Sequence, residues 1–142
     1  MLIDAWTSAG QIILWENKAH STDLAIDFLQ RGLDQNPQSI DILSEMAYCY
    51  LKAKEDPAEP ERQYQKALPY LERAKKIGLE NLQQLSKKEG ESLQENFRRL
   101  SICYRELHKF DEMKANAEQG ISIFGQDLSL RKALDEANRK HN

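Results

Sequence analysis

Three arginines are the residues whose type and spacing best suit recognition chemistry. Arg98, Arg99 and Arg105 lie at helical spacing, so they share one helix surface. Their planar guanidinium groups can donate paired hydrogen bonds to a carboxylate or a phosphate. The cluster therefore favours an acidic peptide as partner. A solvated charged surface is the alternative, because Glu95 and Glu106 are near enough to neutralise these arginines.

The sequence has no recognisable metal or catalytic motif. A metal site needs three or four ligands at workable spacing, whereas the three histidines are scattered, with no cysteine or second histidine one helical turn away. Cys49 and Cys103 each come directly before a tyrosine in similar segments, which predicts a packing role and not a nucleophile. There is no glycine-rich phosphate loop. We therefore expect no enzyme activity, no metal and no cofactor.

The composition favours helices and excludes several classes of partner. The chain has 142 residues, is rich in Leu, Ala, Glu, Lys and Gln, and contains only 6 Gly and 4 Pro. Its formal net charge of −3 disfavours binding to nucleic acid. The apolar run nearest the N-terminus, residues 12–15, is too short for a secretion signal or membrane insertion. A cytoplasmic location is expected, because two cysteines inside predicted helices suit a reducing compartment.

Two segments 54 residues apart have the same pattern of side chains. Residues 43–50 and 97–104 both follow large-x2-large-small-x2-Tyr. This spacing places the repeated residues on one stripe of a helix, and the small residue permits a close helix crossing. The stripes are Leu43, Met46, Ala47 and Tyr50 in the first segment and Phe97, Leu100, Ser101 and Tyr104 in the second. The sequence therefore predicts two equivalent amphipathic helices.

A second amphipathic helix is predicted after each of these segments. Their apolar stripes are Tyr64, Ala67, Leu68, Leu71, Ala74 and Ile77, and then Phe110, Met113, Ala117 and Ile121. A helix of the second type also precedes them and stops at Asn36-Pro37, with Leu24, Ala25, Phe28, Leu29 and Leu33 apolar. A degenerate first helix is expected from about residue 3 to 16, in a register that the sequence does not fix. Residues 128–140 suit a terminal capping helix.

The pattern resembles the tetratricopeptide repeat, whose signature is Trp-x2-Leu-Gly-x2-Tyr, then Ala-x3-Phe, then Pro. Three partial copies match: Ala25-x3-Leu29 with Pro37, the stripe of 43–50 with Ala67-x3-Leu71, and the stripe of 97–104 with Met113-x3-Ala117. The Trp-Leu-Gly element is missing, and Pro69 falls inside a predicted helix, where it should kink that helix or begin a new one. The resemblance implies an all-α fold, a right-handed α-solenoid of stacked antiparallel helix hairpins.

The predicted organisation is a single domain over residues 1–142. Repeat 1 covers about 3–37, repeat 2 about 39–79, repeat 3 about 94–125, and the capping helix 128–140. Because the offset of 54 residues exceeds the family period of about 34, two insertions are expected. We place them at 54–61 and 82–93.

The resemblance also implies a concave groove lined by the first helix of each repeat. The side chains expected to face it are Asp41, Ser44, Glu45, Tyr48 and Leu51 of repeat 2 and Glu95, Arg98, Arg99, Ile102 and Arg105 of repeat 3. Tyr48, Leu51 and Ile102 would anchor a peptide between arginines. Packing of Leu51 and Ile102 against inserted segments is the alternative.

Some tetratricopeptide domains clamp the C-terminal carboxylate of a chaperone with basic residues and an asparagine. That arrangement matches poorly here, because Glu45 stands where the pattern requires Asn and Glu95 where it requires a base.

The sequence therefore predicts a non-catalytic adaptor or scaffold that binds a protein, a peptide or a partner helix in its groove. A structural subunit that self-associates as a homo-oligomer, or docks into a larger assembly, is the alternative. A small helical enzyme is the third interpretation, and a closed apolar cavity lined by paired titratable groups would favour it.

Overall fold

The structure, a computed structural model, describes residues 3–15, 21–53 and 58–141. In these ranges the chain forms seven α-helices and one short 3-10 helix, η1 (Leu82–Gln84). The α-helices are α1 (Ile3–Trp15), α2 (Ser21–Gln35), α3 (Ile40–Lys52), α4 (Arg62–Glu80), α5 (Lys87–Glu106), α6 (Phe110–Phe124) and α7 (Leu128–His141). No helix of the described ranges has both the length and the apolar character that crossing a membrane requires.

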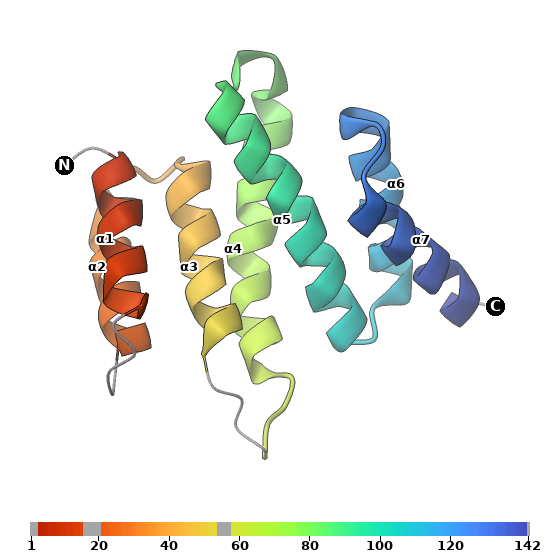
Figure 1. Cartoon of the computed structure of the whole chain (residues 1–142), viewed down its shortest axis with the longest axis horizontal. Coiled ribbons are helices and arrows are strands. Elements are labelled where there is room, and N and C mark those ends of the chain that lie inside the picture. The colour runs from red at the N-terminus through yellow and green to blue at the C-terminus, as the bar shows by residue number, and fades with distance from the viewer. Residues whose placement is uncertain (1–2, 16–20, 54–57, 142) are drawn as a thin grey trace.

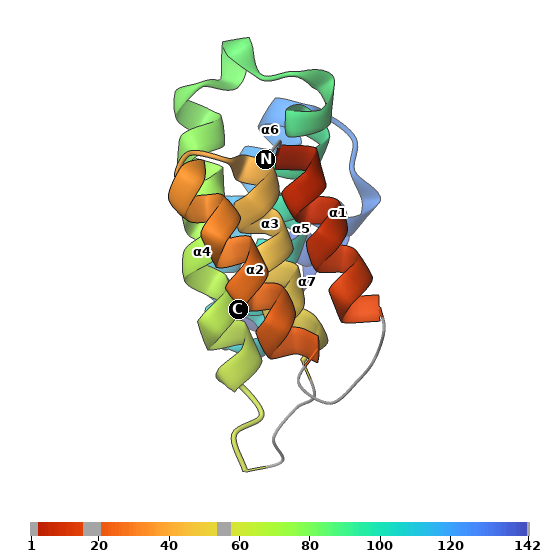
Figure 2. The same ribbon diagram turned by 90° about the vertical axis from the view of Figure 1, so that its left-hand side faces the viewer.

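The helices stack as antiparallel hairpins (Figure 1). The first helices α1, α3 and α5 contact one another in order, and α7 continues their layer by packing on α5. The second helices α2, α4 and α6 each pack between the first helices that precede and follow them. Figure 2 shows α1 and α2 in front when the array is viewed from its N-terminal end. The predicted all-α solenoid of stacked hairpins is therefore confirmed.

The two repeated stripes form much of the core. Seven of their residues are buried: Leu43, Met46, Ala47, Phe97, Leu100, Ser101 and Tyr104. The eighth, Tyr50, is half-buried and stacks on Tyr70 of α4, with ring centroids 5.7 Å apart. Burial of these apolar stripes stabilises the fold by the hydrophobic effect, and their helical spacing is what allows the hairpins to stack.

Trp6 sets the register of α1, which the sequence left open. Its indole is buried, and its ring centroid lies 4.6 Å from that of Phe28 in α2. Gly32 provides the space, because a β-carbon at this position would lie 2.7 Å from Trp6 Cγ. The other tryptophan, Trp15, ends α1, and its side chain lies outside the described part of the chain.

The segment 82–93 is largely helical. Ser86 accepts from the Glu89 amide at 3.1 Å while Glu89 accepts from the Ser86 amide at 3.0 Å, a capping box that begins α5 at Lys87. The buried side chain of Leu93 packs where Gly78 leaves room in α4. As a result the ends of α4 and α5 that η1 joins project beyond the other helices (Figure 1).

The other predicted insertion and the internal proline lie around the start of α4. Residues 54–57 of the segment 54–61 are outside the described residues. Pro69 does not begin a new helix, because α4 passes through it as one element. Pro69 has no amide hydrogen, so one backbone carbonyl of the preceding helical turn has no helical donor. Because Pro69 is exposed, this carbonyl lies on the solvated side of the helix.

Candidate functional site

A pocket of about 300 Å³ lies where α1, α3 and α5 run side by side. Ten residues line it: Thr7, Ser8, Gln11, Asp41, Ser44, Glu45, Lys88, Ser92, Glu95 and Arg99. Each of them comes from a first helix of a hairpin, and each can form hydrogen bonds. We call the surface that α1, α3 and α5 present here the first-helix face. Its pocket is polar, unlike the apolar cavity expected of a small-molecule enzyme.

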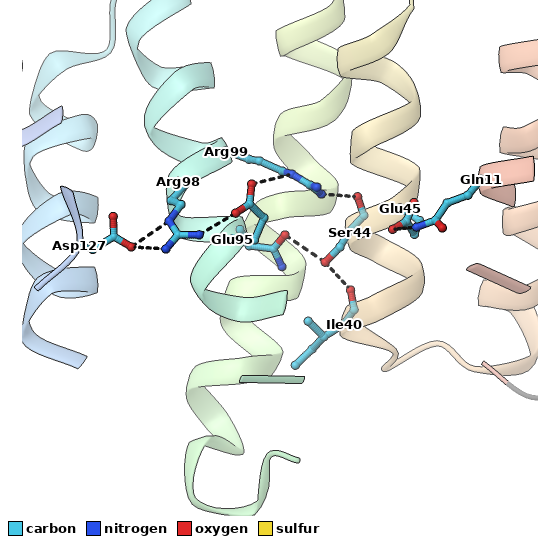
Figure 3. Close-up of polar contacts among 9 residues, drawn as sticks. Gln11, Ile40, Ser44, Glu45, Glu95, Arg98, Arg99 and Asp127 are labelled. Atoms are coloured by element: carbon cyan, nitrogen blue, oxygen red, sulfur yellow. Dashed lines mark hydrogen bonds and ion pairs between the residues drawn. The ribbon is translucent and has the colours of Figure 1, made fainter. Parts of the chain in front are cut away.

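Arg99 joins α5 to α3 at the wall of this pocket (Figure 3). Its Nη1 donates to the Ser44 carbonyl at 3.2 Å, and its Nε lies 3.6 Å from Glu95 Oε1. The guanidinium carbon lies 5.0 Å from the centroid of the Tyr48 ring, a cation–π contact. The side chain of Arg99 is only 18% exposed. Arg99 is thus held by the fold, and it covers the ring that was expected to anchor a peptide.

Arg98 is directed away from the pocket, toward the start of α7 (Figure 3). Its Nε and Nη2 both lie 2.8 Å from Asp127 Oδ2, and its Nη1 lies 2.9 Å from Glu95 Oε2. Asp127 also accepts from the Leu130 amide at 3.0 Å, so the same carboxylate begins α7. Arg98 therefore links two helices and is not a free cation.

The electrostatics of Asp127 follow from these bonds. Burial alone would raise the pKa of Asp127, whose side chain is 1% exposed. The hydrogen bonds from Arg98, the Leu130 amide and Gln94 outweigh burial and hold this pKa below its ordinary value. Asp127 is therefore a buried, ionised carboxylate that fixes α7 against α5.

The remaining predicted residues are spread along the array. Arg105 Nε lies 3.2 Å from Glu106 Oε1, and its Nη1 lies 3.9 Å from Glu136 Oε2 in α7. Ile102 is 39% exposed, so it stays available on the surface of α5. Leu51 is half-buried against the core cluster that contains Tyr104. Of the ten side chains expected to face the groove, five line the pocket between α1, α3 and α5: Asp41, Ser44, Glu45, Glu95 and Arg99.

Glu45 is the half-buried carboxylate of the pocket. Its Oε1 accepts a hydrogen bond of 2.8 Å from Gln11 Nε2 (Figure 3). Burial raises its pKa, and the opposing effects of the Gln11 hydrogen bond and the nearby Arg99 charge do not cancel this. Within the described ranges, no base lies close enough to Glu45 to form an ion pair.

Gln11, Lys88 and Ser92 line the pocket but were not predicted from the sequence. The register of α1 was open, which hid Gln11. Lys88 and Ser92 lie in the segment 82–93, which the sequence predicts to be an insertion. The pattern Ser86-x2-Glu89 was the available signal, because a capping box predicts a helix that starts at residue 87.

The two thiols have the environment of packing residues. Cys49 and Cys103 are both buried and unpaired. Burial raises the pKa of each thiol to about 12, so the nucleophilic thiolate is disfavoured near neutral pH. Across the described ranges, the structure brings together no group of three or more His, Cys, Asp or Glu side chains fit to hold a metal ion.

Comparison with known proteins identifies the fold. Models of protein families give no match to this sequence, and curated proteins give none either. Among solved structures, the tetratricopeptide-repeat (TPR) domain of Sgt2 from Aspergillus fumigatus aligns with a TM-score of 0.68 at 19% identity. The alignment covers 97% of this chain and 78% of that chain. The helices described above therefore have a tetratricopeptide-like fold, as the repeated stripes predicted.

Proposed function

We propose that this chain is a non-catalytic protein-interaction module that binds an extended peptide or a partner helix on its first-helix face. The pocket between α1, α3 and α5 is the observation that carries this proposal. It combines hydrogen-bonding side chains from three helices around one opening of about 300 Å³. Because helices hold these groups in fixed positions, a partner segment lying across them meets a prearranged set of donors and acceptors.

The dimensions and chemistry of the pocket also support a protein partner. Its volume lies at the lower end of the range for small-molecule sites, so it suits one or two side chains of a longer segment. Ile102 provides an exposed apolar contact farther along α5. The buried thiols suit a reducing compartment, so we place this activity in the cytoplasm.

Self-association is the second candidate function. Ile12 of α1 and Leu24 of α2 are 61% and 57% exposed on the N-terminal hairpin. Large exposed apolar side chains at one end of a solenoid are candidates for contact with a second copy. Light scattering over a range of concentrations tests this, and a constant monomer mass would exclude it.

Affinity capture followed by mass spectrometry tests the main proposal. Ser8 lines the pocket and is exposed, so Ser8→Arg places a long side chain in the opening without disturbing the core. Ser129→Arg is the matched control, because Ser129 is an exposed helical serine on α7. We expect Ser8→Arg to lose partners that the wild type and Ser129→Arg retain. Identical captured proteins from all three would contradict binding at this face.

A further inference from the structure

Carboxylates outnumber bases in the pocket of the first-helix face. Asp41, Glu45 and Glu95 line it together with Lys88 and Arg99. Both bases are already engaged by this chain. Arg99 contacts Glu95 and the Ser44 carbonyl. Lys88 forms an ion pair with a fourth carboxylate, that of Asp4 in α1. The pocket as a whole is therefore acidic.

Glu45 is a half-buried carboxylate of this pocket that forms no ion pair with a base of the described residues. Asp41 accepts from Ser92 Oγ at 2.6 Å, and Glu95 lies 2.9 Å from Arg98 Nη1. Among the described residues, the Glu45 carboxylate accepts a hydrogen bond only from the neutral side-chain amide of Gln11. A partly desolvated carboxylate with one neutral donor gains most from an added cation, because an ion pair replaces the lost hydration.

An anionic ligand would find the arginines of α5 already paired with carboxylates of this chain. The three arginines that favoured an acidic peptide in the sequence each face a carboxylate: Asp127 and Glu95 for Arg98, Glu95 for Arg99, and Glu106 for Arg105. A ligand carboxylate would have to compete with these internal partners. A ligand carboxylate at Arg99 would also approach Glu45 and Asp41, which line the same pocket, and these like charges would repel it.

We infer that the first-helix face docks a basic peptide segment, and that the pocket takes one lysine or arginine side chain of that segment with Glu45 as its counter-ion. This inference rests on the proposed function and specifies the chemistry of the partner. Gln11 positions the carboxylate from α1, and the hydroxyl groups of Ser8 and Ser92 lie at the same opening to accept from the ligand. Charge complementarity thus selects the occupant.

Selection from a phage-displayed library of random peptides tests this inference on the whole chain. The wild type is compared with Glu45→Gln, and Glu118→Gln is the matched control, because Glu118 is an exposed glutamate of α6. We expect lysine and arginine to be enriched among peptides selected on the wild type and on Glu118→Gln. A selected peptide should lose about tenfold or more in affinity for Glu45→Gln, measured by fluorescence anisotropy.

A second peptide, in which the enriched lysine is replaced by its apolar isostere norleucine, completes a double-mutant cycle. We expect Glu45→Gln to have little effect on this analogue, since the charge that pairs with Glu45 is gone. If Ser8→Arg blocks peptides that show no basic enrichment, or Glu45→Gln binds both peptides as the wild type does, the inference is overturned while the proposed function stands. If Ser8→Arg blocks no selected peptide, the proposed function fails and the inference with it.

Discussion

The hydroxyl group of Tyr104 in α5 donates a hydrogen bond of 3.0 Å to Glu72 of α4, while the ring of Tyr104 is buried. One residue of the repeated stripe thus serves both the core and the contact between hairpins. The ring supplies the larger share of the stabilisation, because its burial removes apolar surface from water, whereas the hydrogen bond exchanges one partner for another.

The two contributions of Tyr104 can be separated by substitution. We expect Tyr104→Phe to lower the free energy of unfolding by about 1 kcal/mol, and Tyr104→Ala by about 3 kcal/mol. Urea unfolding followed by circular dichroism measures both values. A loss below about half a kcal/mol for Tyr104→Ala would show that this side chain is not part of the core.

Gly120 marks a close crossing between α6 and its neighbours. A β-carbon there would lie 2.6 Å from Leu130 Cδ1 and 2.9 Å from Phe97 Cδ1. We expect Gly120→Ala to destabilise the fold by about 1–3 kcal/mol, because the packed side chains must shift. Gly90 in α5 is the control, since a β-carbon there meets nothing within 4 Å. Gly90→Ala should be neutral or stabilising by up to about 1 kcal/mol in the same unfolding measurement.

Asp127 should stabilise the fold through its ion pair with Arg98 and through its hydrogen bond to the first turn of α7. We expect Asp127→Ala to lower the free energy of unfolding by about 1–2 kcal/mol at neutral pH, and Asp127→Asn by less, because asparagine still caps a helix. The pKa of Asp127 is lowered in the fold, so its contribution is present above the ordinary pKa and is lost as pH falls through the lowered value. Equal stability of wild type and Asp127→Ala at neutral pH would refute this.

Glu45 should show the opposite pH dependence. Its pKa is raised in the fold, so the folded state binds more protons than the unfolded state above the ordinary value of 4.5. As pH rises through this window, the wild type should lose stability relative to Glu45→Gln, which has no charge to desolvate. Thermal unfolding at acidic and neutral pH measures the difference, with Glu118→Gln as control. A difference that stays constant with pH would contradict the burial of this carboxylate.

The thiols should be inert in the folded protein. With pKa values of about 12, Cys49 and Cys103 have almost no thiolate at pH 8, and both side chains are buried. We expect them to react with a disulfide reagent only slowly in buffer and at once in denaturant, as followed by absorbance. Immediate reaction of the native protein would show that the helices open at these positions.

The fold was predictable because its signal is local. Residues such as Leu43, Met46 and Ala47 repeat at the helical period, and that period alone determines which side of a helix is buried. The start of α5 is also encoded locally, in the capping box of Ser86 and Glu89.

The site was less predictable because its chemistry depends on residues that are distant in sequence. Lys88 pairs with Asp4 across 84 positions, and Arg98 pairs with Asp127 across 29. Helical spacing placed the arginines on one surface but gave no information about which carboxylates other helices would bring to them. The sign of the local charge is therefore a property of the packing between helices.

The position of Asp127, after α6 and at the start of α7, has a consequence for shortened forms of this protein. A fragment that stops before residue 127 lacks the carboxylate that holds Arg98 Nε and Nη2. Its guanidinium would keep only the contact with Glu95, so the positive charge of Arg98 would be less compensated. Such a fragment would present a more positive surface at Arg98 than the intact array does, so its ligand binding would not represent that of the whole chain.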